Sequence, residues 1–491
     1  MTSVRKSLAF SALDSYLAMV LQIVSTVIIA RILTPEQTGI YAVAAVFASL
    51  ASTFRDFGVG EYLIQEADLT QDAIRAALTV NIGVSWAMAV LLFVAAPWAG
   101  EFYRAEGVRD VMRVQAINFL LIPFGAVTMA WFRREMNFKP ILLASLLGNS
   151  ISFAVVLTLA LKGYGYMSLA WSSLAGVVVT VAVSMALRPA SFPRWPGTRG
   201  VAKVVNFGKF ASGIYIFGQL GKGAPEMIIG RAQNMAAVGM FSRAQGLVEI
   251  FNRLVVRAIM PVYLPYFAKA VRDTGSPKPG LLQAMAYLTA VGWPFLAFMG
   301  IAAFAAVRLM YGQQWLDSVP LARILCGVAA LELVYVASKE CMLSKGLARE
   351  SNNLQVVTQL LRVAGLFAVF KFGLLGACWG LFAAATVGMV VSHAYLARHV
   401  GVRVDEVLRS LWPSVQVTCI TVAPLALWAL FKPIDESNYL AVAALAGTSA
   451  CVLWLASLKL TRHPLWPEIA RIGVGIKGRL GRQRSTPGDG P

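Results

Sequence analysis

The chain has 491 residues, of which 58% are apolar (AVILMFWYC) and only 14% are charged. A soluble domain is about 45–50% apolar, even with glycine counted, and about 25% charged, so one water-facing globule could not bury this many apolar side chains. The composition, with a mean hydropathy of +0.67, excludes an ordinary cytosolic enzyme, a disordered protein and a disulfide-rich secreted module, and it indicates an integral membrane protein.

The predicted elements are transmembrane helices, because a helix that crosses the hydrocarbon core needs about 20 mostly apolar residues. The first apolar stretch follows Arg5 and Lys6, is long and lacks a small-residue cleavage site, so we expect a retained helix rather than a signal peptide. About 14 such stretches predict an all-α integral membrane protein with short connections and no separate soluble domain. They lie at 8–30, 38–60, 76–97, 111–132, 140–161, 166–187, 208–230, 236–260, 283–307, 319–343, 354–371, 374–396, 411–431 and 438–458.

The net charge of +19 is explained by membrane topology. With the amino terminus inside, the connections and tails on the cytoplasmic side hold 26 lysines and arginines, and those on the opposite side hold 8. Cytoplasmic loops of membrane proteins carry this excess of positive charge. We therefore expect both termini in the cytoplasm and no nucleic-acid partner.

The sequence contains an internal repeat. The segment IIARILTPEQTGIY from Ile28 matches IIGRAQNMAAVGMF from Ile228 without a gap, with Gly39 aligned to Gly239. Later, GYMSLAW from Gly165 resembles GLLGACW from Gly373. The copies lie six spans apart, and six is an even number, so both copies enter the membrane in the same direction. This predicts two parallel six-helix repeats related by an axis along the membrane normal, plus two carboxyl-terminal helices.

The repeat also predicts how the chain is divided. We expect an amino-terminal six-helix lobe and a second six-helix lobe joined by a basic cytoplasmic linker. Two further transmembrane helices and a basic cytoplasmic tail should follow. The expected boundaries are 1–187, 188–207, 208–397, 398–460 and 461–491.

Ionisable side chains within the spans are the candidate functional residues, because charge at bilayer depth is costly and usually faces a cavity or a partner. In the seventh span, Gly221, Gly223 and Pro225 should interrupt the helix. Asp14 and Glu226 are candidates for an ion-coupling carboxylate. The candidate basic residues are Lys222, Arg243, Arg253, Arg257 and Lys339.

The eighth span has the clearest pattern. At 100° per residue, Arg243, Glu249, Arg253 and Arg257 project within an arc of roughly 120°, so one face of this helix should be polar and net cationic. The near balance of acidic and basic residues within all the spans leaves an alternative open, in which many of these groups form internal ion pairs that fix helix packing.

Other residue types suggest structural roles. The histidines and cysteines show no metal-ligand spacing, so we expect neither a metal site nor a cofactor. Several tryptophans near span ends should be interfacial anchors: Trp86, Trp98, Trp131, Trp315, Trp412 and Trp466.

Four segments of the sequence resemble a known family. ARILTPEQTGIYAVAAVF followed by FRDFGVGEYLIQ, then VGMFSRAQGL and IMPVYLPYF, is similar to the Wzx-type oligosaccharide flippases. These belong to the superfamily that also contains the MATE multidrug exporters and the peptidoglycan-precursor flippase. The resemblance implies movement of a polyprenyl-pyrophosphate-linked oligosaccharide across the bacterial inner membrane, with a polysaccharide polymerase or export machinery as a further partner.

Arginines suit such a substrate because the planar guanidinium makes bidentate, charge-assisted hydrogen bonds to phosphate. The expected site is a hydrated, positively lined chamber, with the lipid tail left in the bilayer. A MATE-like antiporter for small molecules or a peptidoglycan-precursor flippase would share this architecture. A membrane-embedded glycan polymerase or ligase would normally need a sizeable extracytoplasmic loop with acid and base residues, and the sequence shows none.

Overall fold

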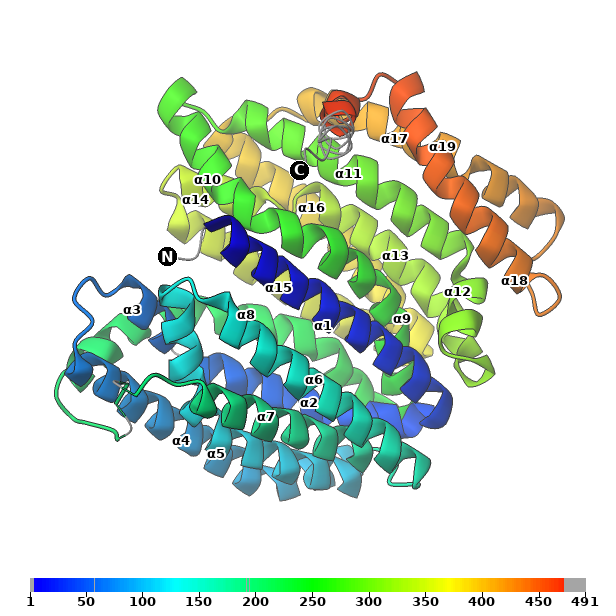
Figure 1. The fold of residues 1–491 in the computed structure, drawn as a ribbon. Coiled ribbons are helices and arrows are strands. Elements are labelled where there is room, and N and C mark those ends of the chain that lie inside the picture. Colours follow the sequence, from blue (N-terminus) through cyan, green and yellow to red (C-terminus); the bar gives the residue numbers. More distant parts are fainter. Residues whose placement is uncertain (1–3, 57, 191, 194, 472–491) are drawn as a thin grey trace, which may run out of the picture. The chain divides into compact units, whose positions relative to one another are not determined.

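The computed structural model describes residues 4–56, 58–190, 192–193 and 195–471. Helices and turns account for the secondary structure, and this part of the chain contains no strand (Figure 1). The chain forms two compact units. Unit 1 comprises residues 1–243, 310–315 and 370–374, and unit 2 comprises the remainder. The lobe boundaries expected from the repeat stay a prediction, and the tail beyond residue 471 lies outside the described residues.

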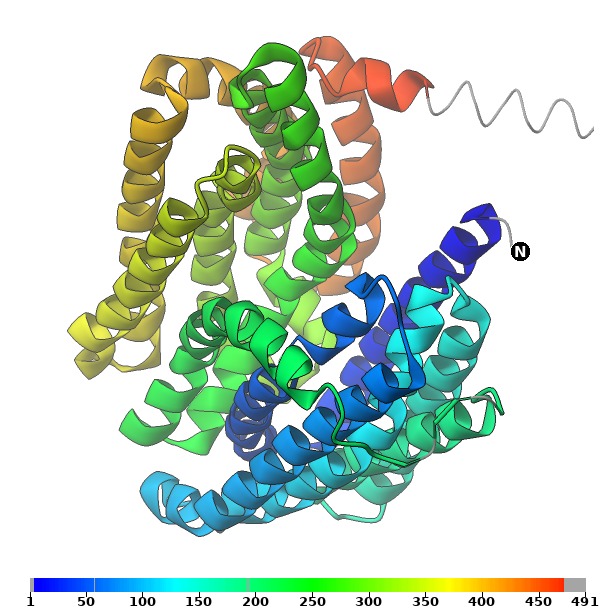
Figure 2. The ribbon, with the colours of Figure 1, turned by 90° about the vertical axis from the view of Figure 1, so that its left-hand side faces the viewer.

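The described residues of unit 1 form seven helices of 20 residues or more and the short helix α3. α4 and α5 run side by side and are joined by a tight turn, in which Arg104 has a φ of 52° (Figure 2). The helices are α1 Val4–Ile32, α2 Pro35–Asp56, α3 Val59–Gln65, α4 Gln71–Tyr103, α5 Glu106–Arg134, α6 Phe138–Leu161, α7 Met167–Ala186 and α8 Val201–Ala232, followed by the first half of α9 Met235–Phe251.

Unit 2 is also helical, but several of its helices are interrupted by short π or 3-10 turns. After α9 the chain forms η1 Asn252–Val256, α10 Arg257–Thr274, α11 Lys278–Ile301, α12 Ala303–Met310, η2 Gln313–Ser318, α13 Val319–Val334, α14 Ser338–Ser344, α15 Ala348–Val369, η3 Phe370–Phe372, α16 Gly373–Val400, α17 Val404–Phe431, α18 Tyr439–Ala441, η4 Val442–Ala446 and α19 Gly447–Leu460. Of these, η3, the last residue of α12, the first half of η2 and the first two residues of α16 belong to unit 1.

Eleven helical segments of the described chain are long and apolar enough to cross a membrane, so the protein is a multi-pass membrane protein. The predicted spans at 208–230, 236–260 and 354–371 form helices but are not among the eleven. These three segments carry most of the charged side chains that the sequence places at bilayer depth, and such side chains lower the mean hydropathy. The predicted count of 14 is therefore not confirmed.

The predicted interruption of the seventh span is wrong. α8 runs from Val201 to Ala232 without a break and contains Pro225. The proline ring meets the carbonyl group of the residue four positions earlier, which is Gly221, and membrane helices tolerate this arrangement where neighbouring groups satisfy the freed carbonyl. Gly223 instead serves packing, because a Cβ atom there would lie 2.4 Å from a methyl group of Val46 on α2.

The end of unit 1 that carries α3 is held by polar contacts. The guanidinium of Arg134 donates to the carbonyl oxygens of Leu63, at 2.8 Å, and of Glu66, so it binds the carbonyl end of α3. Lys203 Nζ lies 2.8 Å from Glu66 Oε2, and this ammonium group lowers the pKa of Glu66. Thr79 Oγ1 donates to the carbonyl oxygen of Gly197 at 2.7 Å. The segment that precedes α8 is therefore bound to α4.

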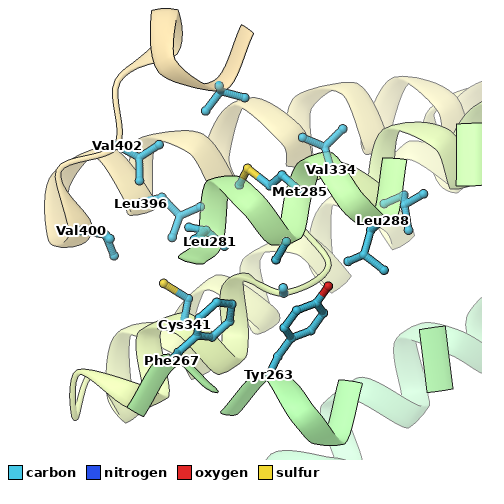
Figure 3. Close-up of a cluster of buried hydrophobic side chains, with 14 of the residues drawn as sticks. Tyr263, Phe267, Leu281, Met285, Leu288, Val334, Cys341, Leu396, Val400 and Val402 are labelled. Atoms are coloured by element: carbon cyan, nitrogen blue, oxygen red, sulfur yellow. The ribbon is translucent and has the colours of Figure 1, made fainter. Parts of the chain in front are cut away.

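The apolar core of unit 2 joins α10, α11, α14 and α16 (Figure 3). Phe267 and Leu281 are fully buried, and the rings of Tyr263 and Phe267 stack with their centroids 5.5 Å apart. Leu396 and Cys341 close the cluster from α16 and α14. Burial of these side chains fixes the position of the short helix α14 against α10, α11 and α16.

The carboxyl-terminal end of the described chain docks on unit 2 through a buried histidine. His463 has 0% exposure, and its Nε2 atom lies 3.2 Å from Ser414 Oγ on α17. The backbone N–H of Leu465 donates to His463 Nδ1 at 3.1 Å, so the ring proton belongs on Nε2. Burial lowers the pKa of His463 to about 4. The imidazole is therefore neutral near pH 7.

Candidate functional site

α2 and α9 cross at the two glycines that the internal repeat aligns. A Cβ atom on Gly39 would lie 1.7 Å from the carbonyl oxygen of Met235, and one on Gly239 would lie 2.0 Å from that of Pro35. Because Pro35 and Met235 are also aligned in the repeat, the contact is reciprocal, as at a two-fold interface. Only glycine permits so close an approach of two backbones. The two copies of the repeat therefore meet through equivalent residues.

Arg243 lies one turn after Gly239 on α9, against two aromatic rings of unit 1. Its guanidinium carbon is 5.0 Å from the ring centroid of Trp315 and 5.5 Å from that of Tyr311. Its Nε atom is buried without a hydrogen-bond partner, and among the described residues no carboxylate forms an ion pair with it. Cation–π contacts contribute about 2 kcal/mol each when they are shielded from water. Arg243 thus retains a positive charge that the described side chains do not neutralise.

The two rings belong to residues 310–315, which we call the clasp segment. Trp315 Nε1 donates to the carbonyl oxygen of Ala30 at 2.6 Å. Gln314 Nε2 donates to the same oxygen at 2.7 Å and to that of Leu33 at 3.1 Å. These carbonyl groups lie at the end of α1, where helical hydrogen-bond partners run out. Trp315 has 0% exposure, so the prediction that it anchors an interface is wrong: its N–H group binds protein.

The other candidates of unit 1 lie on α8 and α1. Lys222 is exposed, and Glu226 lies one turn further along α8 and is partly buried. Asp14 on α1 is partly buried. Their proposed roles in ion coupling and head-group binding stay predictions.

In unit 2, the π turn η1 collects the remaining charges of the predicted stripe. Arg253 Nε lies 3.5 Å from Glu249 Oε1, and the guanidinium of Arg257 pairs with the same oxygen. Asn252 Nδ2 donates to Glu249 Oε2 at 3.3 Å. π turns often occur at functional sites because they disturb helical register. One carboxylate therefore serves two arginines, and the cluster keeps a net positive charge.

The tenth predicted span, 319–343, is not one continuous helix. α13 ends at Val334, and α14 begins at Ser338 and carries Lys339, which is partly buried. Glu332 Oε1 accepts a hydrogen bond from Arg362 of α15 at 3.3 Å. Tyr335 in the break contacts His393 Nδ1 through its hydroxyl at 3.0 Å. Glu332 thus belongs to an ion pair between helices, which fits the alternative that some charged groups within the spans fix helix packing.

Unit 2 also contains a groove of about 740 Å³ between α11, α13 and α17. Apolar and small side chains such as Trp293, Leu296 and Ala330 form most of its wall. Arg323 is the one charged residue among those that line it. An apolar groove with a single cationic group suits an amphiphile that carries an anionic head.

The sequence predicted some of these site residues. The structure brings Arg253 and Arg257 together through Glu249 and places Arg243 in unit 1. The clasp segment and Arg323 were not predicted from the sequence. The available signal for the clasp segment was the run YGQQW, in which aromatic and amide groups stand together between two apolar stretches.

The family assignment rests on most of the length of the chain. A family described as "Polysaccharide biosynthesis protein" matches residues 28–320, which is more than half of the sequence. The chain belongs to this family. The resemblance to the polysaccharide branch of the flippase superfamily is confirmed.

Relatives of this polysaccharide biosynthesis protein come from several bacteria. It is 24% identical to "Teichuronic acid biosynthesis protein TuaB" of Bacillus subtilis over 81% of this chain and 83% of the relative. It is 22% identical to "Lipopolysaccharide biosynthesis protein WzxC" of Escherichia coli over 94% of each. It is 25% identical to "Succinoglycan biosynthesis transport protein ExoT" of Rhizobium meliloti over 66% of this chain and 65% of the relative.

Solved structures of other proteins share the fold of this chain. The lipid II flippase MurJ, in an inward closed conformation, aligns with a TM-score of 0.72 at 12% identity, over 92% of this chain and 98% of that one. An inward-facing multidrug resistance transporter of the MATE family aligns with a TM-score of 0.59 at 16% identity, over 78% and 95%. The predicted all-α fold of the MATE-like exporter superfamily is confirmed.

Proposed function

We propose that the protein is a flippase that moves a polyprenyl-pyrophosphate-linked oligosaccharide across the bacterial inner membrane by alternating access. Membership of a polysaccharide biosynthesis family and the MurJ-like fold support a transporter rather than an enzyme. The observation that carries the proposal is the excess of arginine over carboxylate on α9, η1 and α10. Arg253 and Arg257 share Glu249, and Arg243 has no carboxylate partner among the described residues.

The head group of such a substrate needs donors and positive charge. A pyrophosphate cannot enter hydrocarbon unaided, and arginine forms bidentate hydrogen bonds to it. We assign head-group contacts to Arg243, Arg253 and Arg257, with Lys222 and Lys339 as additional cations. Because Glu249 already binds two of these arginines, a phosphate would have to compete with it, whereas Arg243 has no such competitor among the described residues.

The lipid tail requires a different surface. The groove between α11, α13 and α17 is apolar over most of its wall, and its volume of about 740 Å³ suits part of a prenyl chain. Arg323 would then contact a phosphate or the membrane interface at the polar end of that chain. Such a groove would leave the tail in contact with the bilayer while the head group moves.

The direction of transport follows from charge. Two negative charges that move outward run with an inside-negative membrane potential, which contributes roughly 4–5 kcal/mol at about 100 mV. Asp14 and Glu226 are our candidates for coupling to an inward cation gradient. With both termini in the cytoplasm, the product would be delivered to the outer leaflet, where a polymerase or export machinery uses it.

A drug antiporter of the same fold is the main alternative. Its cationic substrates would require an acidic binding surface, whereas the arginine excess on α9, η1 and α10 favours an anion. The substrate class therefore separates the two functions.

The direct test replaces Arg243 or Arg253 by glutamine in the bacterium that makes the glycan. Surface polysaccharide should fall at least ten-fold while the amount of protein in the membrane stays unchanged. As a matched control, Arg409→Gln removes an exposed arginine that pairs with Asp405, and it should leave export intact. Normal surface glycan in the Arg243 and Arg253 variants would refute their assigned role.

A further inference from the structure

The clasp segment and Arg243 form one connected arrangement. Trp315 holds the end of α1 through its N–H group and Arg243 through its ring face. Tyr311, with 1% exposure, provides the second ring. The reciprocal approach at Gly39 and Gly239 lies one turn away from Arg243 along α9. The same side chain that stabilises the clasp segment is thus a cation without a carboxylate partner among the described residues.

We propose that Arg243 couples the binding of an anionic head group to the opening of the clasp segment. The coupling rests on the proposed function, because it assigns the trigger to the pyrophosphate of the transported lipid. With no ligand, the guanidinium stays against Trp315 and Tyr311, and the clasp segment remains on the carbonyl end of α1. A phosphate that takes the guanidinium withdraws it from the rings and weakens that attachment.

The energetics favour such an exchange. A ligand shifts a conformational equilibrium only by its difference in affinity for the two states. Charge-assisted hydrogen bonds to phosphate are about twice as strong as neutral ones, and a phosphate offers several acceptor oxygens to the unsatisfied Nε–H and its neighbours. With the clasp segment on α1, the described residues give the same guanidinium two ring contacts and no carboxylate. Phosphate binding and clasp closure therefore compete for one side chain.

The movement is measured on the purified full-length protein in detergent. The five native cysteines are replaced. Spin labels are then attached at Glu36→Cys, in the first turn of α2, and at Gln313→Cys, in the clasp segment; both are exposed positions of unit 1. Addition of inorganic pyrophosphate should lengthen the distance between the two spin labels. Geranyl pyrophosphate is the second probe. A response at lower concentration assigns the trigger to a lipid head group and an equal response assigns it to the free anion, and both support the coupling.

Three variants separate the contributions. Arg243→Gln should abolish the response to pyrophosphate, and Arg243→Lys, which keeps the charge but loses the planar fork, should weaken it. Trp315→Phe keeps a ring but loses the donor to Ala30, so it should raise the ratio of open to closed clasp about five-fold without ligand, the equivalent of one hydrogen bond of about 1 kcal/mol. Arg231→Gln is the matched control: Arg231 stacks on Phe102 instead, and its loss should leave the response intact.

Unchanged distances with both probes, or a response that persists in Arg243→Gln, would overturn the coupling. The outcomes are distinct from failure of the proposed function. If glycan export requires Arg243 while the distances never respond, transport stands and the coupling is wrong. If the distances respond in an Arg243-dependent way but no lipid-linked oligosaccharide moves, the clasp is a pyrophosphate-controlled device in a protein with another substrate.

Discussion

Gly39 and Gly239 occupy equivalent positions in the two copies of the repeat, and each faces the backbone that precedes the other. A Cβ atom on either glycine would lie 2.0 Å or less from a carbonyl oxygen. The contact is therefore both a structural record of the duplication and a steric requirement of the observed state.

This geometry predicts the effect of adding one methyl group. Gly39→Ala or Gly239→Ala should force α2 and α9 apart and destabilise the observed state by about 1–3 kcal/mol, the usual cost of overpacking. Thermal unfolding of the purified protein, followed by intrinsic fluorescence, measures the loss. Gly83→Ala is the control, because no atom lies within 4 Å of a Cβ atom there. Equal melting temperatures for the Gly39 and Gly83 variants would contradict the close approach.

The second prediction concerns the carboxylate that serves two arginines. Glu249→Gln should release Arg253 and Arg257 and raise the affinity for a prenyl pyrophosphate about five-fold, the equivalent of about 1 kcal/mol. Equilibrium binding to a fluorescent prenyl pyrophosphate measures this change. Glu436→Gln, which frees Arg308 elsewhere in unit 2, should leave the affinity unchanged. A weaker affinity in the Glu249 variant would mean that this carboxylate positions the arginines rather than competing for them.

The third prediction is a pH dependence that arises from His463. Burial lowers the pKa of its imidazole from 6.5 to about 4, so the unfolded chain binds the additional proton between these values. Stability from this group is therefore complete above about pH 6.5 and falls as the pH drops toward 4, by up to about 3 kcal/mol. Urea unfolding between pH 4 and 7 measures this contribution. In His463→Gln, that part of the slope should vanish, and an unchanged slope would exclude His463 as its source.

The fourth prediction is the topology. Single cysteines at Lys162 and Lys432 should react with a membrane-impermeant thiol reagent in intact spheroplasts, whereas a cysteine at Arg471 should react only after permeabilisation. Protection of the first two positions together with labelling of Arg471 would reverse the predicted orientation.

The sequence was sufficient for features that depend on composition and spacing. Apolar stretches predicted the helices, and the alignment of Gly39 with Gly239 predicted a repeat whose copies the structure brings into contact. The cationic character of the eighth span was also correct near Glu249. Predictions that assumed a continuous α-helix failed where the backbone is irregular. The π turn η1 interrupts the predicted charged stripe, and residues 335–337 interrupt the tenth span. The structural roles of Trp315 and Pro225 could not be predicted from the sequence alone. Trp315 binds the carbonyl group of Ala30, which is distant along the chain, and the effect of Pro225 depends on the carbonyl group of Gly221.

Transport itself is the most direct test. The purified protein is reconstituted into liposomes that contain a fluorescent, short-chain prenyl-pyrophosphate oligosaccharide, and the fraction of label that an impermeant quencher can reach is followed with time. We expect the protein to move labelled lipid from the inner to the outer leaflet within minutes, and Arg253→Gln to slow this movement at least ten-fold. Label movement no faster than in protein-free liposomes, with correctly folded protein present, would contradict the proposed function.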